Sequence, residues 1–138
     1  MKYVVAAVLL ALASIAVPNL HTAMQRSDQK RTMADMRTIA TAWEARATDR
    51  NTYLVARPGI VSYDDLHLAL EPKYVKQLPR DDGWGNPFVF ASNDQEYSIR
   101  AIGADHRIDG HLVPGATTDF DCDILYANGS FTAYPEGI

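Results

Sequence analysis

Three carboxylates alternate with apolar side chains near the C-terminus of the chain. They belong to Asp119, Asp121 and Asp123. The alternation predicts a strand, and successive carboxylates would then lie on one face of it, about 7 Å apart. Like charges at this spacing disfavour folding unless water or a cation screens them. Hard oxygen ligands of this kind suit calcium, which takes about six to eight oxygens at roughly 2.3–2.6 Å.

The loop before these aspartates could complete a metal site. It runs from Gly103 to Thr118 without apolar periodicity, and it carries Asp105 and Asp109. The backbone carbonyl of Ile102 could add a further oxygen. Loops of this length in small domains are usually functional or disordered. The residues themselves leave two interpretations open: a calcium site, or a solvated acidic loop with aspartates in turns.

The other reactive side chains form no catalytic pattern. Cys122 lies on the apolar side of the predicted strand and is expected to be a small buried residue, since no histidine can be assigned as its base. His106 and His111 could join Asp105 in a transition-metal site, which is a further alternative. The sequence has no Ser-His-Asp order, phosphate-binding loop or zinc spacing, so we expect no enzymatic activity.

The elements that must position these residues begin with a long helix. From Tyr3 to Val17 the chain carries no charge, so this segment cannot be a helix surface that faces water. After Pro18 a charged helical pattern follows, and a helix continuous to Ala47 would be roughly 70 Å long. A small head cannot cover that length, so the first half must lie in lipid or against other subunits. The second half has one apolar stripe, formed by Met36, Ala40, Trp43 and Ala47.

The apolar run could be a membrane anchor or a secretory signal peptide. Met1 to Pro18 spans about 27 Å as a helix, slightly less than the roughly 30 Å hydrocarbon layer. Small residues near Ala13 and Ala16 would suit a signal-peptide cleavage site. More basic residues follow the run than precede it, so the positive-inside rule would place the head in the cytoplasm.

The remaining residues predict a small head. Tyr53 to Val61 is expected to be a loop, and a short helix follows the capping residue Ser62 and ends at Pro72. Asn128-Gly129 is a hairpin signal. Strands are predicted at Phe88–Ala91, Tyr97–Ile102, Phe120–Ala127 and Ser130–Tyr134.

These elements predict an α+β fold, in which the long N-terminal helix packs on a small antiparallel sheet of three or four strands. We divide the chain into an apolar helix half (residues 1–18), an amphipathic helix half (19–50) and a globular head (51–138). A net charge of −4 and a pI near 5.4 argue against nucleic acid as a partner. The single cysteine excludes an intrachain disulfide.

Short motifs along nearly the whole chain occur in an order that is typical of one family. They are Ala16-Val17-Pro18-Asn19-Leu20, Pro72-Lys73-Tyr74-Val75, Leu78-Pro79, Asp81-Asp82-Gly83-Trp84-Gly85-Asn86-Pro87-Phe88, Gly103-Ala104-Asp105 and Asp121-Cys122-Asp123-Ile124. In this order the chain resembles the type IV pilin-like family, and within it the major pseudopilins of the type II secretion system.

The resemblance implies a structural subunit of a pseudopilus-like filament that supports protein export across the outer membrane. It implies a single-pass inner-membrane protein with its head in the periplasm, which later enters a periplasmic or extracellular filament. The implied partners are membrane lipid, copies of the chain in a helical filament, other pseudopilins and inner-membrane assembly proteins. The residues expected to face lipid and then the filament core are Val5, Val8, Leu9, Leu12, Ile15 and Pro18.

The resemblance also implies calcium in the C-terminal loop. Asp105 matches the family's aspartate after Gly-Ala, while Asp121 and Asp123 match its paired aspartates. His106 stands where the family usually has glycine. The expected ligand set is Ile102, Asp105, Asp109, Asp121 and Asp123.

The start of the chain departs from the family pattern. The basic leader, the Gly-Phe processing site and the early glutamate have no counterpart in the sequence. We expect either that the true start lies upstream or that the protein is not processed. Two alternatives stay open: a membrane-tethered or secreted calcium-binding interaction module, and a subunit of a true type IV pilus.

Overall fold

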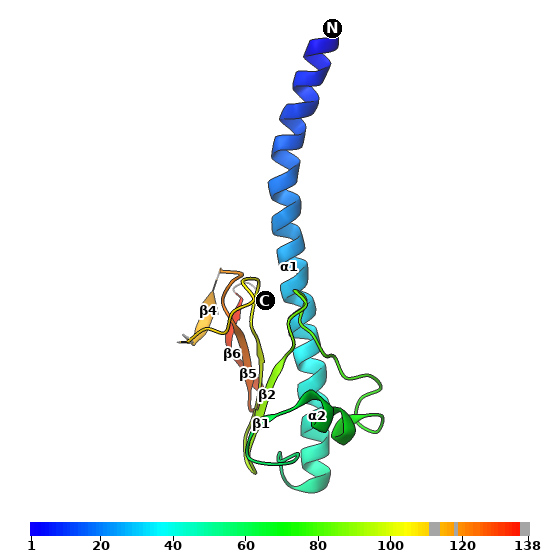
Figure 1. Cartoon of the computed structure of the whole chain (residues 1–138), viewed down its shortest axis with the longest axis vertical. Coiled ribbons are helices and arrows are strands. Elements are labelled where there is room, and N and C mark those ends of the chain that lie inside the picture. The colour runs from blue at the N-terminus through cyan, green and yellow to red at the C-terminus, as the bar shows by residue number, and fades with distance from the viewer. Residues whose placement is uncertain (111–113, 118, 136–138) are drawn as a thin grey trace.

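One helix forms the spine of the molecule in this computed structural model, which describes residues 1–110, 114–117 and 119–135. Helix α1 (Lys2–Arg50) is 49 residues long, and the head packs against its C-terminal half only (Figure 1). The helix contains no glycine and continues without a break through Pro18. It ends at Asn51, whose backbone adopts the left-handed conformation (φ 57°, ψ 30°) that asparagine tolerates at a helix end.

The head begins with loop residues and the short helix α2 (Tyr63–Leu70). The Ser62 side chain caps α2 by accepting a hydrogen bond from the Asp65 N–H at 3.2 Å. Leu66 and Leu70 are its buried residues. The capping serine and the two leucines therefore behave as the sequence predicts.

A six-stranded sheet makes up the rest of the described head, in the order β1-β2-β3-β5-β6-β4. All neighbouring strands are antiparallel except β4 and β6, which are parallel. The strands are β1 (Gly59–Val61), β2 (Val89–Ser92), β3 (Tyr97–Ala101), β4 (Gly115–Thr117), β5 (Ile124–Ala127) and β6 (Ser130–Pro135). The α+β class is confirmed. The expected number of three or four strands is too low, because β1 and β4 are three-residue edge strands inside segments read as loops.

The predicted third strand is also too long at its start. It begins at Ile124 rather than Phe120, and residues 120–122 form a turn and a bend. The Asp119 side chain accepts a hydrogen bond from the Asp121 N–H at 2.9 Å, which is a turn that aspartate favours over a strand. The aspartates therefore do not share one strand face. Asp123 is fully buried, whereas Asp119 and Asp121 are exposed.

The core lies between the C-terminal half of α1 and the sheet. Trp43 packs edge-on against Phe90, with ring centroids 6.3 Å apart, and lies 5.1 Å from the Tyr97 ring. Its Nε1 donates to the Tyr53 carbonyl at 2.9 Å, so the buried indole is satisfied. The predicted stripe is confirmed and is wider than expected. The buried residues of α1 are Gln29, Thr32, Met33, Met36, Ile39, Ala40, Ala42, Trp43 and Ala47.

Candidate functional site

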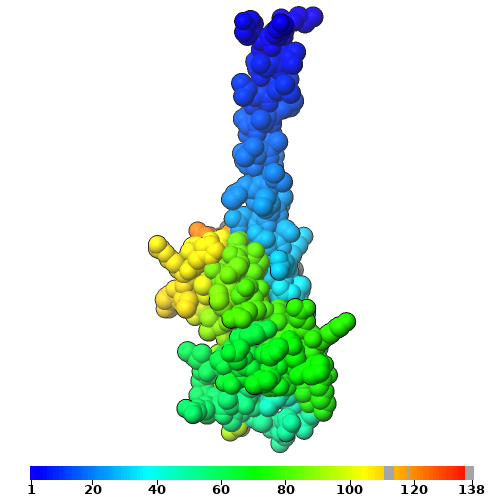
Figure 2. Space-filling model, turned by 45° about the vertical axis from the view of Figure 1, so that its right-hand side comes forward, coloured from blue at the N-terminus to red at the C-terminus, as the bar shows by residue number. Residues whose placement is uncertain are grey.

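The first functional feature is the uncovered N-terminal half of α1, which we call the bare half (residues 2–24). By length and composition it could cross a membrane, and none of its apolar window is buried within the chain. Figure 2 shows it as a narrow column that projects away from the head. The residues predicted to face lipid are all exposed: Val5, Val8, Leu9, Leu12, Ile15 and Pro18.

The serine and threonine hydroxyls of the bare half are bonded within the helix itself. Ser14 Oγ donates to the Ala11 carbonyl at 2.8 Å, and Thr22 Oγ1 donates to the Pro18 carbonyl at 3.1 Å. Such local bonds let hydroxyl residues enter apolar surroundings without an unpaired donor. The bare half can therefore be covered by lipid or by other apolar helices.

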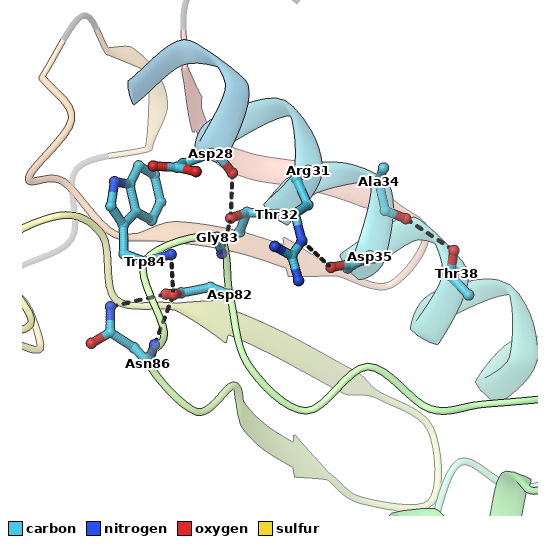
Figure 3. Close-up of polar contacts among 10 residues, drawn as sticks. All are labelled: Asp28, Arg31, Thr32, Ala34, Asp35, Thr38, Asp82, Gly83, Trp84 and Asn86. Carbon is cyan, nitrogen blue, oxygen red and sulfur yellow. Dashed lines mark hydrogen bonds and ion pairs between the residues drawn. The ribbon is translucent and has the colours of Figure 1, made fainter. Parts of the chain in front are cut away.

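The second feature is the loop around Trp84, which we call the tryptophan loop (residues 81–87). The buried Asp82 carboxylate organises it. Asp82 Oδ1 accepts from the Trp84 N–H and the Asn86 N–H, both at 2.9 Å, and Oδ2 accepts from Asn86 Nδ2 at 3.2 Å (Figure 3). A carboxylate that accepts several N–H bonds inside a turn holds that turn rigidly.

This loop is clamped to α1 just where the bare half ends. The Gly83 N–H donates to Thr32 Oγ1 at 2.8 Å, and Thr32 Oγ1 in turn donates to the Asp28 carbonyl at 2.7 Å (Figure 3). Trp84 Nε1 donates to Gln25 Oε1 at 2.6 Å. A Cβ on Gly83 would lie 2.8 Å from Asp28 Cα, so only glycine fits this approach. The clamp fixes the head on the helix.

The third feature lies before β5, and we call its described residues (103–110 and 119–123) the acidic loop; it buries Asp123. Its Oδ2 contacts Arg100 Nε at 2.5 Å and accepts from the Asp109 N–H at 3.1 Å. In return, Asp109 Oδ2 accepts from the Asp123 N–H at 2.8 Å, and Arg100 Nη2 donates to the Asp109 carbonyl at 2.6 Å. Burial raises the pKa of Asp123, while the Asp109 N–H and Arg100 oppose that rise.

The structure unites only part of the predicted ligand set. Asp109 and Asp123 are directly linked, but Asp105 bonds locally, with its Oδ1 accepting from the Arg107 N–H at 2.9 Å. Asp121 is exposed, and Ile102 is half-buried. Within the part of the chain that the structure describes, no three His, Cys, Asp or Glu side chains lie close enough to share a metal ion.

The side chains of the alternative metal site are placed differently. His106 Nδ1 contacts Asn86 Oδ1 of the tryptophan loop, and His111 lies outside the described residues. Cys122 is half-buried rather than a core residue, with its Sγ 3.6 Å from Thr117 Oγ1.

The described residues do not fit calcium as the expected set would. One observation favours an ion, since Asp123 Oδ1 is buried without a hydrogen-bond partner among the described groups. Against it, the Arg100 guanidinium already contacts the same carboxylate, and a divalent ion there would be repelled by that charge. Calcium binding stays a prediction from the resemblance.

Sequence reasoning missed the residues that join the parts. Gln25 and Thr32 have no pattern of their own in the sequence. Together with Gln29 they recur every three or four residues, which places their polar side chains on the same face of α1, the face that packs on the head. In the sequence, Asn86 stands out only as part of a family motif. Its Nδ2 also donates to the Gly103 carbonyl at 2.9 Å, which ties the tryptophan loop to the acidic loop. Nothing in the residues next to Arg100 indicates that it contacts Asp123.

The long helix, its uncovered apolar half and the small α+β head together define a pilin-like protein. The chain is 32% identical over 111 residues to the type II secretion system core protein G of Aeromonas hydrophila, which covers 74% of this chain and 77% of that protein. It is 29% identical over 115 residues to the protein of the same name from Vibrio cholerae serotype O1, covering 78% of each. No family model matches the chain, and no solved structure matches it significantly. The chain belongs to the family of type II secretion system core protein G, a pseudopilin family.

Proposed function

We propose that the chain is a structural, non-enzymatic subunit of a type II secretion filament that supports protein export across the outer membrane. The bare half anchors the monomer in the inner membrane, with the head in the periplasm. It then packs among the helices of neighbouring copies and other pseudopilins when the filament forms. The observation that carries this proposal is the bare half itself, whose apolar side chains are uncovered, while the C-terminal half of the same helix buries one face against the head.

The energetics favour two successive environments for the bare half. Burying one large aliphatic side chain stabilises a protein by about 1.5–3 kcal/mol relative to leaving it in water. Lipid provides this burial for a monomer, and helices of other subunits provide it in a filament. A head-to-tail contact that does not close into a ring repeats indefinitely, so one such contact is enough to build a helical filament.

A secretion assay in the native host tests this proposal. The gene is deleted and replaced by wild type, by Leu12→Asp on the bare half, or by Ile60→Asp on the exposed edge strand β1. Both variants add one carboxylate at an exposed apolar position, where the residue is 59% and 83% exposed, respectively. A carboxylate in the middle of a membrane helix costs about 2.5–3.5 kcal/mol. We expect Leu12→Asp to abolish secretion and Ile60→Asp to retain it; normal secretion by Leu12→Asp would contradict the proposal.

Cross-linking separates a filament from a tethered single subunit. In a Cys122→Ser background, pairs of cysteines placed along the bare half should give a ladder of linked oligomers longer than dimers, because the contact is head-to-tail. Monomers alone would favour the tethered interaction module, and dimers alone would mean a closed contact. If the deletion strain still secretes protein but loses its surface pili, the chain belongs to a pilus instead.

A further inference from the structure

Asp123 is a fully buried carboxylate with an arginine in direct contact. Arg100 belongs to β3, which pairs with β5 through Ala101 and Ile124, and Asp123 immediately precedes β5. The strand pairing therefore brings the arginine side chain to the base of the acidic loop. Only 24% of the Arg100 side chain is exposed, and none of the Asp123 side chain is. The pair is thus largely shielded from water.

We propose that the Arg100 guanidinium is the cation that holds the acidic loop of this chain, in the role that the family resemblance gives to calcium. The loop consequently folds without a divalent ion. This inference concerns the acidic loop alone and does not depend on filament formation by the bare half.

The directions of the hydrogen bonds support an arginine-held loop. Arg100 uses Nε for the Asp123 carboxylate and Nη2 for the Asp109 carbonyl, so its planar fork spans both arms of the loop. Each aspartate also accepts the backbone N–H of the other. A metal ion in this loop would need these same Asp109 and Asp123 oxygens as ligands. They already accept N–H bonds and would have to give them up to bind it.

Charge and ligand number point the same way. A buried carboxylate without a counter-charge is strongly unfavourable, and Arg100 supplies that charge from within the chain. Among the described residues of this loop, Asp123 Oδ1 is the buried side-chain oxygen without a hydrogen-bond partner, whereas calcium takes roughly six to eight oxygens. Asp105 and Asp121 do not make up the difference among the described residues, because no metal-sized cluster forms there.

Thermal unfolding of the full chain in non-ionic detergent tests the proposal directly. The melting temperature is measured in millimolar calcium chloride and in excess chelator. Calcium at about a hundredfold excess over its dissociation constant would raise the melting temperature of a domain this small by roughly 10 °C or more. We expect the two melting temperatures to agree. A rise of that size with calcium in the wild-type protein would overturn the proposal, whether or not any variant folds.

A double-mutant cycle tests the role of the charge. Arg100→Leu should lower the melting temperature by roughly 10 °C or more, because Asp123 is left buried and unpaired. Adding Asp123→Asn to Arg100→Leu should restore at least half of that loss, since both charges are then removed. Arg107→Leu is the matched control, an exposed arginine of the same loop, and should melt like wild type. A double variant no more stable than Arg100→Leu, or an equal loss in Arg107→Leu, would show that the Arg100 charge is not what holds the loop.

Discussion

Two aspartates among the described residues of the head are buried, and their carboxylates are held in different ways. Asp82 is 3% exposed, and its carboxylate accepts hydrogen bonds from Trp84 and Asn86, no more than four residues away. Asp123 is 0% exposed and bonds to Arg100 on another strand and to Asp109 fourteen residues earlier. One carboxylate is held by neutral local donors, and the other by a distant cation.

The comparison teaches which buried charge needs a counter-charge. A carboxylate folded into its own turn meets several N–H dipoles at once, so the turn can form before the rest of the head packs. Asp123 has no such turn around it and depends on β3 pairing with β5. The two loops are nevertheless joined, because Asn86 Nδ2 bonds both to Asp82 and to the Gly103 carbonyl. Damage to one loop can therefore spread to the other.

The largest loss of stability in this comparison is expected in the tryptophan loop, from Gly83→Ala. Its Cβ would lie 2.8 Å from Asp28 Cα and 2.9 Å from Asp28 C, which are backbone atoms that cannot move aside. We expect a loss of about 3 kcal/mol in the free energy of unfolding, measured by denaturant in detergent. Gly110→Ala is the control, since a Cβ there has no atom of the described residues within 4 Å. Equal stability of the two variants would mean that the clamp on α1 contributes little.

The same change of charge at both aspartates tests the comparison most directly. Asp123→Asn leaves the Arg100 guanidinium without its carboxylate, so we expect a loss of about 2 kcal/mol in unfolding free energy. Asp82→Asn keeps an oxygen for the two backbone N–H groups and disturbs only the contact with Asn86 Nδ2. Its expected loss is about 1 kcal/mol. Chemical denaturation measures both, and a larger loss at Asp82 would reverse the distinction drawn between the loops.

The sequence predicted those parts of the fold that have a local pattern. The end of α1, the Ser62 cap, the buried stripe with Trp43 and the hairpin at Asn128 all follow from nearby residues. The strands β1 and β4 could not be predicted, because three residues are too few to show an alternation. Their pairing depends on partners elsewhere in the sheet, with β4 reaching β6 in parallel.

The candidate sites also divide into features with a local sequence pattern, which were predictable, and features that depend on distant residues, which were not. The bare half was predictable, since an uncharged run of that length cannot face water. The order of the tryptophan loop was predictable from its turn residues, but its partner Thr32 was not, because an isolated threonine in a helix carries no such signal. The alternation at residues 119–123 predicted a strand, and the turn at Asp119 prevailed instead. Arg100 could be recognised only once β3 and β5 were seen to pair.

Two threonines of α1 sharpen the account of the clamp. Thr32→Val should cost about 1–2 kcal/mol of unfolding free energy, because the Gly83 N–H loses its acceptor in a partly buried contact. Thr38→Val is the matched control, since its hydroxyl is exposed and bonds only to the Ala34 carbonyl of the same helix, at 3.0 Å (Figure 3). We expect little change at Thr38. Equal losses would trace the effect to helix propensity rather than to the loop.

The smallest effect on stability is expected at Asp35, which is less buried than Asp82 and Asp123 and has a weaker ion pair than Asp123. It is half-buried on α1, and its one ion-pair contact, to Arg31 Nε, is long at 3.9 Å and exposed (Figure 3). Burial raises the pKa of Asp35, and Arg31 only partly opposes that rise. A raised carboxyl pKa favours the protonated folded state, so its stability contribution is present below about pH 4 and is lost as the pH rises through the folded-state pKa. Asp35→Asn should therefore raise the melting temperature slightly at pH 7 and match wild type near pH 3. A lower melting temperature at pH 7 would mean that the contact with Arg31 outweighs the cost of burial.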